Sequence, residues 1–175
     1  MAGLPTTPET LLAQFDALGI EYLNVKHAPV FTVEEAKQHR TEEMVGACLK
    51  NLFVVDRKKR MYLLVLLEDR AVNLKEVAAM LETKDLRFGS PDRLMERMGV
   101  IPGSVSPFCA VNDLEDKVTV YLDEGMKAYS HMLAHPLSND QTTRMSIDDL
   151  VRYLDSVGHS PKWLVFPDAA AAADA

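Results

Sequence analysis

The stretch GVIPGSVSPF at residues 99–108 holds two glycines, two prolines and two serines between a predicted helix and a predicted strand. Gly103, followed by Ser104 and Ser106, leaves backbone N–H groups that no bulky side chain obstructs, and the prolines restrict the freedom of the loop. Such a loop can bind an anion or a carbonyl oxygen. The alternative is a plain connection, because these residue types are common in any loop.

A lysine interrupts the apolar stretch CLKNLFVV at residues 48–55. Lys50 is either a strand-edge residue whose amine reaches water or a cation that positions an anionic or ester group. Asn51 follows it, and a strand would place that side chain on the opposite face. The lysine alone favours the structural interpretation, so the choice depends on the other motifs.

The third polar stretch is HPLSNDQTT at residues 135–143. His135 is either a structural histidine or a contact to substrate or water, and Ser138 and Asn139 either line a pocket or form a turn. No Ser-His-Asp order, metal-ligand spacing or phosphate-binding glycine loop accompanies them. The sequence therefore predicts a site without a metal or cofactor.

Composition predicts one soluble domain. The chain has 175 residues, of which 47% are hydrophobic, and a net charge of −7. This charge argues against a protein that coats nucleic acid non-specifically. A local basic surface is still compatible with it, at RKKR (57–60) and at Arg70, although RKKR alone is typical of a solvated hairpin tip. We expect a domain over residues 1–166 and a flexible tail over 167–175.

Helix and strand patterns alternate along the chain, which predicts the α+β class with a mixed, mostly antiparallel and curled sheet flanked by helices. Capping residues predict helices that begin after Thr7, Thr32, Asn73, Ser90 and Ser146. The helix after Thr32 is expected to end near residue 43. Strands are expected at 20–28, 51–57, 61–67, 117–123, 129–135 and 142–145. The run MYLLVLL at 61–67 is apolar on both faces, which predicts a central strand.

Neither the cysteines nor the apolar runs indicate secretion or insertion into a membrane. Cys48 and Cys109 have no metal or disulfide spacing and are interpreted as small hydrophobic residues. The longest apolar run is too short to cross a bilayer, and the N-terminus does not resemble a signal peptide. We therefore expect a cytoplasmic protein with no membrane contact.

Taken in order, CLKNLFVV, GSVSPF and HPLSNDQTT, together with HAPVFTVEEA at 27–36, resemble the YbaK/ProX family of free-standing aminoacyl-tRNA deacylases. The resemblance runs from the first helix to about Trp163 and is greatest to the branch that acts on alanyl-tRNA(Pro). It implies trans-editing, in which the ester of mischarged alanyl-tRNA(Pro) is hydrolysed and proline is excluded by size. The stretch HPLSNDQTT differs from the sequence pattern that is usual in this family.

Residue roles follow from this resemblance. It implies catalytic roles for Lys50, Gly103, Ser104, Ser106 and His135. It implies substrate contacts for His27, Phe31, Asn51, Val105, Pro107, Ser138 and Asn139, although Phe31 is also expected to pack in the core. Contacts to tRNA phosphates are expected from Arg57, Lys58, Lys59 and Arg70. The implied partners are the acceptor end of tRNA(Pro), prolyl-tRNA synthetase and elongation factor.

Two other functions stay open on the sequence. The same fold could hydrolyse cysteinyl-tRNA(Pro), as in the YbaK branch. A non-catalytic module that binds tRNA or a synthetase would show tight tRNA binding with no release of amino acid.

Overall fold

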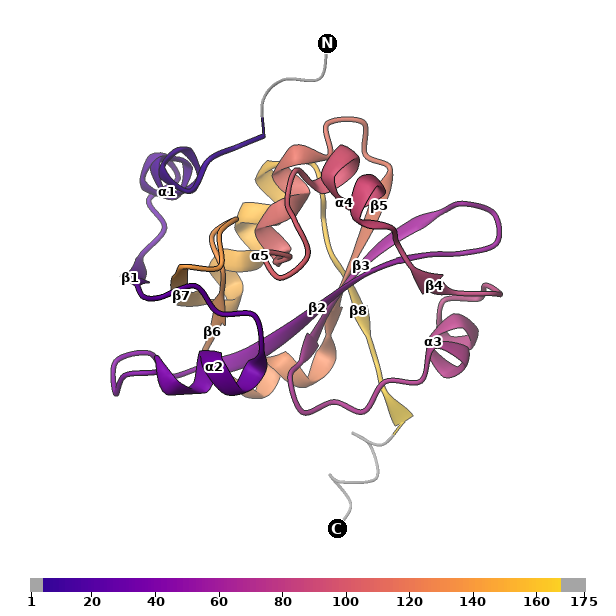
Figure 1. Cartoon of the computed structure of the whole chain (residues 1–175), viewed down its shortest axis with the longest axis horizontal. Coiled ribbons are helices and arrows are strands. Elements are labelled where there is room, and N and C mark those ends of the chain that lie inside the picture. The colour runs from indigo at the N-terminus through magenta and orange to yellow at the C-terminus, as the bar shows by residue number, and fades with distance from the viewer. Residues whose placement is uncertain (1–4, 168–175) are drawn as a thin grey trace.

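An eight-stranded mixed sheet forms the centre of the protein, which a computed structural model describes over residues 5–167 (Figure 1). Its strands lie in the order β1 (Tyr22–Lys26), β7 (Gln141–Ser146), β6 (His131–Ala134), β2 (Ala47–Val55), β3 (Met61–Leu67), β5 (Val118–Asp123) and β8 (Lys162–Leu164). The short β4 (Arg87–Phe88) pairs with the end of β2. The pairs β2–β6, β3–β5 and β5–β8 are parallel and the others antiparallel. This open sheet confirms the predicted α+β class.

Helices begin where the capping residues predict. The described residues form α1 (Pro8–Ala17), α2 (Val33–Gln38), α3 (Leu74–Met80), α4 (Pro91–Met98), α5 (Ile147–Ser156) and the 3-10 helices η1 (Pro107–Asn112) and η2 (Glu124–Ala128). All five predicted caps accept a backbone N–H through their side chains. The predicted end of α2 near residue 43 is wrong, because the helix ends at Gln38. Except for Pro167, the expected tail lies outside the described residues.

The core occupies both faces of the sheet. On one face, helices α1, α4 and α5 contribute to a cluster in which Phe15 packs against Phe108 and Tyr153. Helix α3 covers part of the other face (Figure 1). Residues of β3 alternate between the two clusters and are fully buried from Leu63 to Leu66. This alternation confirms β3 as the predicted central strand.

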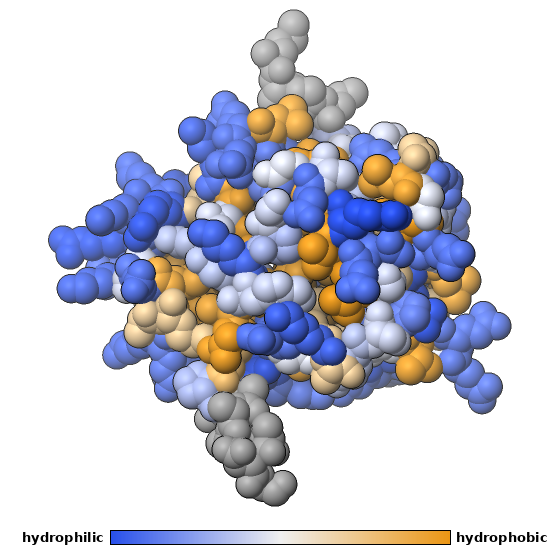
Figure 2. Space-filling model, turned by 180° about the vertical axis from the view of Figure 1, so that it is seen from behind, coloured by the Kyte–Doolittle hydropathy of each residue, from blue (hydrophilic) through white to orange (hydrophobic). Residues whose placement is uncertain are grey.

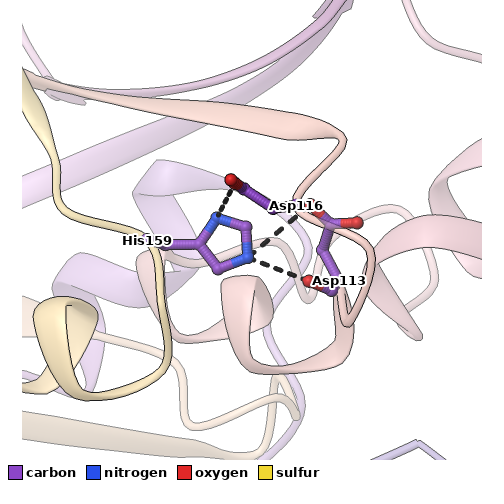
Figure 3. Close-up of side chains that lie close together, drawn as sticks. All are labelled: Asp113, Asp116 and His159. Atoms are coloured by element: carbon purple, nitrogen blue, oxygen red, sulfur yellow. Dashed lines mark hydrogen bonds and ion pairs between the residues drawn. The ribbon is translucent and has the colours of Figure 1, made fainter.

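A buried histidine ties the loop after η1 to the segment that follows α5 (Figure 3). His159 Nε2 donates to the backbone oxygen of Asp113 at 3.0 Å. Asp113 Oδ2 accepts the backbone N–H groups of Lys117 and Val118, each at 2.8 Å. Asp116 Oδ1 lies 3.6 Å from His159 Nδ1. Because His159 Nε2 and Asp113 Oδ2 are already engaged by backbone groups, we interpret the cluster as a structural clasp.

The surface is mixed in character. On the face seen from behind, apolar residues form small groups between hydrophilic ones (Figure 2). Within residues 5–167, every helix is too short or too polar to span a membrane.

Candidate functional site

A cavity of about 280 Å³ lies beside an unpaired part of β2. β2 pairs with β6 at Ala47 and Cys48, and with β4 at Val54 and Val55 on the same edge. Between these contacts the edge has no partner strand in the described part of the chain. Seven of the predicted site residues line the cavity: His27, Phe31, Lys50, Asn51, Gly103, Val105 and His135.

Neighbouring polar residues of β2 both reach the cavity. Lys50 lines the cavity, and its Nζ donates to the backbone oxygen of Arg70, a residue outside the cavity lining. Asn51 belongs to the same lining, together with its neighbours Cys48 and Leu49, so a continuous stretch of β2 borders the cavity. Among the described residues, Asn51 Oδ1 is the one buried side-chain nitrogen or oxygen without a hydrogen-bond partner. Leaving a buried acceptor unpaired costs about 1–3 kcal/mol, so Asn51 Oδ1 is an exception to the usual pairing of buried polar groups.

Two histidines of the cavity have defined tautomers. His135 Nδ1 lies 2.7 Å from the carbonyl oxygen of Gln141, and because a carbonyl only accepts, Nδ1 carries the proton. Burial lowers the pKa of His135, and the nearby His27 lowers it further, against the hydrogen bond to Gln141 that raises it. His135 is therefore neutral near pH 7, and its Nε2 is an acceptor. His27 Nδ1 donates to Ala28 O in the same way, and its Nε2 contacts Thr142 Oγ1 at 2.8 Å.

The glycine loop presents its backbone to the cavity rather than its serines. Gly103 has φ +92°, a conformation that favours glycine. Within residues 5–167, the N–H groups of Gly103 and Val105 donate to no protein acceptor. Ser104 and Ser106 are buried outside the cavity lining, and Pro107 is buried as the first residue of η1. Two N–H groups of this loop are therefore unpaired within the described chain, and their predicted use as donors to a substrate stays a prediction, as do direct roles of the serine hydroxyls.

The turn between β6 and β7 is hydrogen-bonded to Val30, a residue that lines the cavity. Asn139 accepts the N–H of Val30 through its backbone oxygen and donates its side-chain amide to Val30 O, both at 3.0 Å. Ser138 donates to the carboxylate of Asp140. Neither Ser138 nor Asn139 lines the cavity, so their predicted substrate contacts remain predictions and the structure gives them turn-forming bonds.

The predicted tRNA-binding residues lie in two different environments. Arg57, Lys58 and Lys59 are exposed at the tip of the β2–β3 hairpin. At about 3.3 Å per residue, β2 alone separates this tip from Lys50 by roughly 17 Å. The Arg70 guanidinium is instead bound to the buried carboxylate of Asp123, with Nε–Oδ2 at 2.7 Å and Nη2–Oδ1 at 2.8 Å.

The sequence gives no signal for several other residues of the cavity. Arg40 and Glu68 form a double ion pair at the wall, with N–O distances of 2.8 and 3.2 Å. His39 stacks on His27 with ring centroids 5.2 Å apart. Cys48 is half-buried. Burial raises the pKa of its thiol, and the nearby Arg40 guanidinium offsets only part of this increase. These contacts join residues that no local motif connects.

The expectation that Phe31 packs in the core is wrong. Its side chain is 69% exposed, yet Phe31 is part of the cavity wall. A Cβ built on Gly103 would lie 3.9 Å from Phe31 Cδ1, so the ring and the glycine loop face one another.

The sheet and its cavity define a small α+β domain with an ammonium group, a neutral imidazole and free backbone donors suited to a carbonyl-containing ligand. Residues 27–153 match the family model described as aminoacyl-tRNA editing domain. The chain belongs to this family.

Similar proteins span most of the chain. It is 34% identical over 151 residues to prolyl-tRNA synthetase associated domain-containing protein 1 of Danio rerio, covering 85% of this chain and 82% of that protein. It is also 34% identical over 155 residues to prolyl-tRNA editing protein ProX of Acetoanaerobium sticklandii, covering 88% and 94%. The fold is similar to a crystal structure of a proposed trans-editing enzyme for prolyl tRNA synthetase, with TM-score 0.66, 21% identity and coverage of 93% and 98%.

Proposed function

We propose that this protein is a trans-editing aminoacyl-tRNA deacylase that hydrolyses the ester of alanyl-tRNA(Pro). One observation carries the proposal: Lys50, Asn51, Gly103 and His135 come from three separate segments and line one cavity. The family membership and the similarity to ProX support the same class of substrate.

The proposed reaction adds water to the ester carbonyl and releases the amino acid from the terminal ribose. The Lys50 ammonium holds the terminal phosphate or the ester. Free N–H groups of Gly103 and Val105 stabilise the oxyanion that develops on the carbonyl oxygen. Neutral His135 accepts a hydrogen bond from the attacking water through Nε2. The carbonyl carbon–ribose oxygen bond then breaks, and one proton of the attacking water passes to the ribose oxygen. The amino acid leaves as its carboxylate, and the second proton of the water goes to solvent.

Recognition of the amino acid combines a hydrogen-bond acceptor and a size limit. Asn51 Oδ1 is buried and unpaired among the described residues, and its side chain turns toward the cavity to accept a hydrogen bond from the α-ammonium group of alanine. Apolar side chains, among them Val25, Leu49 and Leu133, line the same small cavity. A synthetase pocket for proline rejects the smaller alanine by only about 1–3 kcal/mol, so a second site that admits alanine and excludes the proline ring is needed.

The proposal is tested by release of labelled amino acid from alanyl-tRNA(Pro), cysteinyl-tRNA(Pro), prolyl-tRNA(Pro) and alanyl-tRNA(Ala). We expect rapid release from alanyl-tRNA(Pro) alone and a loss of at least about 100-fold in Lys50→Ala, in line with the loss of one group that stabilises a transition state. Lys117→Ala, at an exposed position outside the cavity lining and outside the proposed tRNA contacts, is the matched control for catalysis. Release from cysteinyl-tRNA(Pro) would instead favour the cysteine-specific alternative, and tRNA binding without release would favour the recruiting module.

The partners in this proposal are the acceptor end of tRNA(Pro) and prolyl-tRNA synthetase, with elongation factor competing for correctly charged alanyl-tRNA(Ala). Arg57, Lys58 and Lys59 contribute phosphate contacts at the hairpin tip, where their side chains are exposed. The protein acts in the cytoplasm, where its substrate is made.

A further inference from the structure

Phe31 is an exposed aromatic residue in the wall of the cavity. Among the cavity-lining residues of the described chain it is the sole phenylalanine, tyrosine or tryptophan. Its side chain is 69% exposed, whereas its chain neighbour Val30 is 3% exposed and anchors the segment in the core. An exposed aromatic ring that borders a cavity offers a flat surface on which a planar ligand can stack.

Hydrogen bonds hold the backbone rigidly on both sides of this exposed ring. Asn139 clamps Val30 through two hydrogen bonds of 3.0 Å. The carboxylate of Glu35 accepts the N–H of Phe31 at 2.6 Å and that of Thr32 at 3.3 Å, as part of the capping box of α2. The ring is therefore presented from a fixed backbone, and a ligand that binds it has little backbone ordering to overcome.

The glycine loop lies against one edge of the ring. A Cβ at Gly103 would be in ordinary van der Waals contact with Phe31 Cδ1, at 3.9 Å, so no planar ligand fits between the two. The exposed part of the ring is therefore elsewhere on its surface, close to the loop whose N–H groups are proposed to hold the ester carbonyl. A base bonded to the same ribose as the ester is the group that would stack there.

We infer that Phe31 is a stacking platform for the unpaired terminal base of the tRNA 3′ end. This inference rests on the proposed function, because the ester in the cavity brings the ribose and its base to the mouth. Every base has a π-face that stacks on an aromatic side chain, so the contact tolerates any sequence and supplies affinity and positioning. Phe31 thereby orients the nucleotide while Lys50 and the loop engage the ester.

The test measures binding of an acceptor-stem minihelix that carries no amino acid and ends in either a terminal adenine or an abasic terminal ribose. Stacking of one base predicts that wild-type protein binds the abasic end about 5- to 150-fold more weakly. Phe31→Ala should lose the same factor with the intact end and nothing more with the abasic end. Phe31→Tyr should keep wild-type affinity. Phe88→Ala is the matched control, because that ring is 62% exposed on β4, which pairs with the far end of β2.

The outcomes separate this inference from the proposed function. Two results would overturn the stacking platform. The first is equal affinity of wild type and Phe31→Ala for the intact end. The second is a loss in Phe31→Ala bound to the abasic end that equals the product of the two single losses, because independent losses would mean that the ring and the base do not contact each other. An abasic penultimate nucleotide should weaken wild type and Phe31→Ala by the same factor. The minihelix carries no amino acid, so its binding does not depend on hydrolysis. Stacking on Phe31 with no release of amino acid from any aminoacyl-tRNA would refute the proposed hydrolase activity and support the platform. Release from alanyl-tRNA(Pro) that does not depend on Phe31 would support the hydrolase and refute the platform. Failure of wild type to bind the minihelix would also refute the platform.

Discussion

The buried ion pair between Arg70 and Asp123 allows a quantitative prediction of stability. The Asp123 side chain is fully buried, that of Arg70 is 13% exposed, and Nε and Oδ2 lie 2.7 Å apart. Arg70→Met keeps most of the apolar stem but leaves the carboxylate without its counter-charge. Removing one partner of a buried pair costs about 3–5 kcal/mol. At about 2–4 °C per kcal/mol for a domain of this size, the melting temperature should fall by about 6–20 °C.

The matched control is an exposed pair of the same length. Arg97 Nη1 and Glu115 Oε2 also lie 2.7 Å apart, but the two side chains are 28% and 64% exposed. Arg97→Met should therefore cost about 0–1 kcal/mol. Urea unfolding, followed by the fluorescence of the single tryptophan, Trp163, measures both free energies. Equal losses in the two variants would refute the argument that burial decides the cost.

Two pH-dependent predictions follow from individual carboxyl and imidazole groups. Burial alone would raise the pKa of Asp56, but hydrogen bonds from Thr83, Arg60 and Tyr62 hold it at about 2, below the ordinary 3.8. The folded state then favours the charged form, so the free energy of unfolding should fall as pH decreases from about 4 to about 2, and Asp56→Asn should flatten this fall in acid-unfolding curves. His135 should titrate below pH 6.5 by NMR because burial lowers its pKa, and a midpoint at or above 6.5 would contradict its neutral role.

Local sequence signals were sufficient for much of the fold. Each predicted helix start carries a side chain that caps its own backbone, so a few neighbouring residues determine it. The two-faced apolar run of β3 likewise defines its central place. By contrast, β4 and β8 have two and three residues, which are too short to carry a periodic pattern. Their pairing depends on the strands already in the sheet.

Prediction of the site was less complete because its contacts are long-range. The motifs containing Lys50, Gly103 and His135 indicated candidate residues, and the structure places all three at one cavity while their roles stay predictions. Nothing local distinguishes the Arg70 that binds Asp123 from a surface arginine, since its partner lies 53 positions away. Phe31 also reads as a core residue by type, and only its tertiary surroundings show it as exposed.

The separation in sequence of the segments that line the cavity has a consequence for folding. His27 and Thr142 are 115 positions apart, and their side chains contact each other beside the pairing of β1 with β7. Contacts between such distant segments slow folding, because a long loop must close before they form. During synthesis the segment that holds His27 leaves the ribosome well before the segment that holds Thr142, so the site assembles only after most of the chain has emerged. A nascent or truncated chain lacking the last third would therefore hold the motif lysine without a cavity around it.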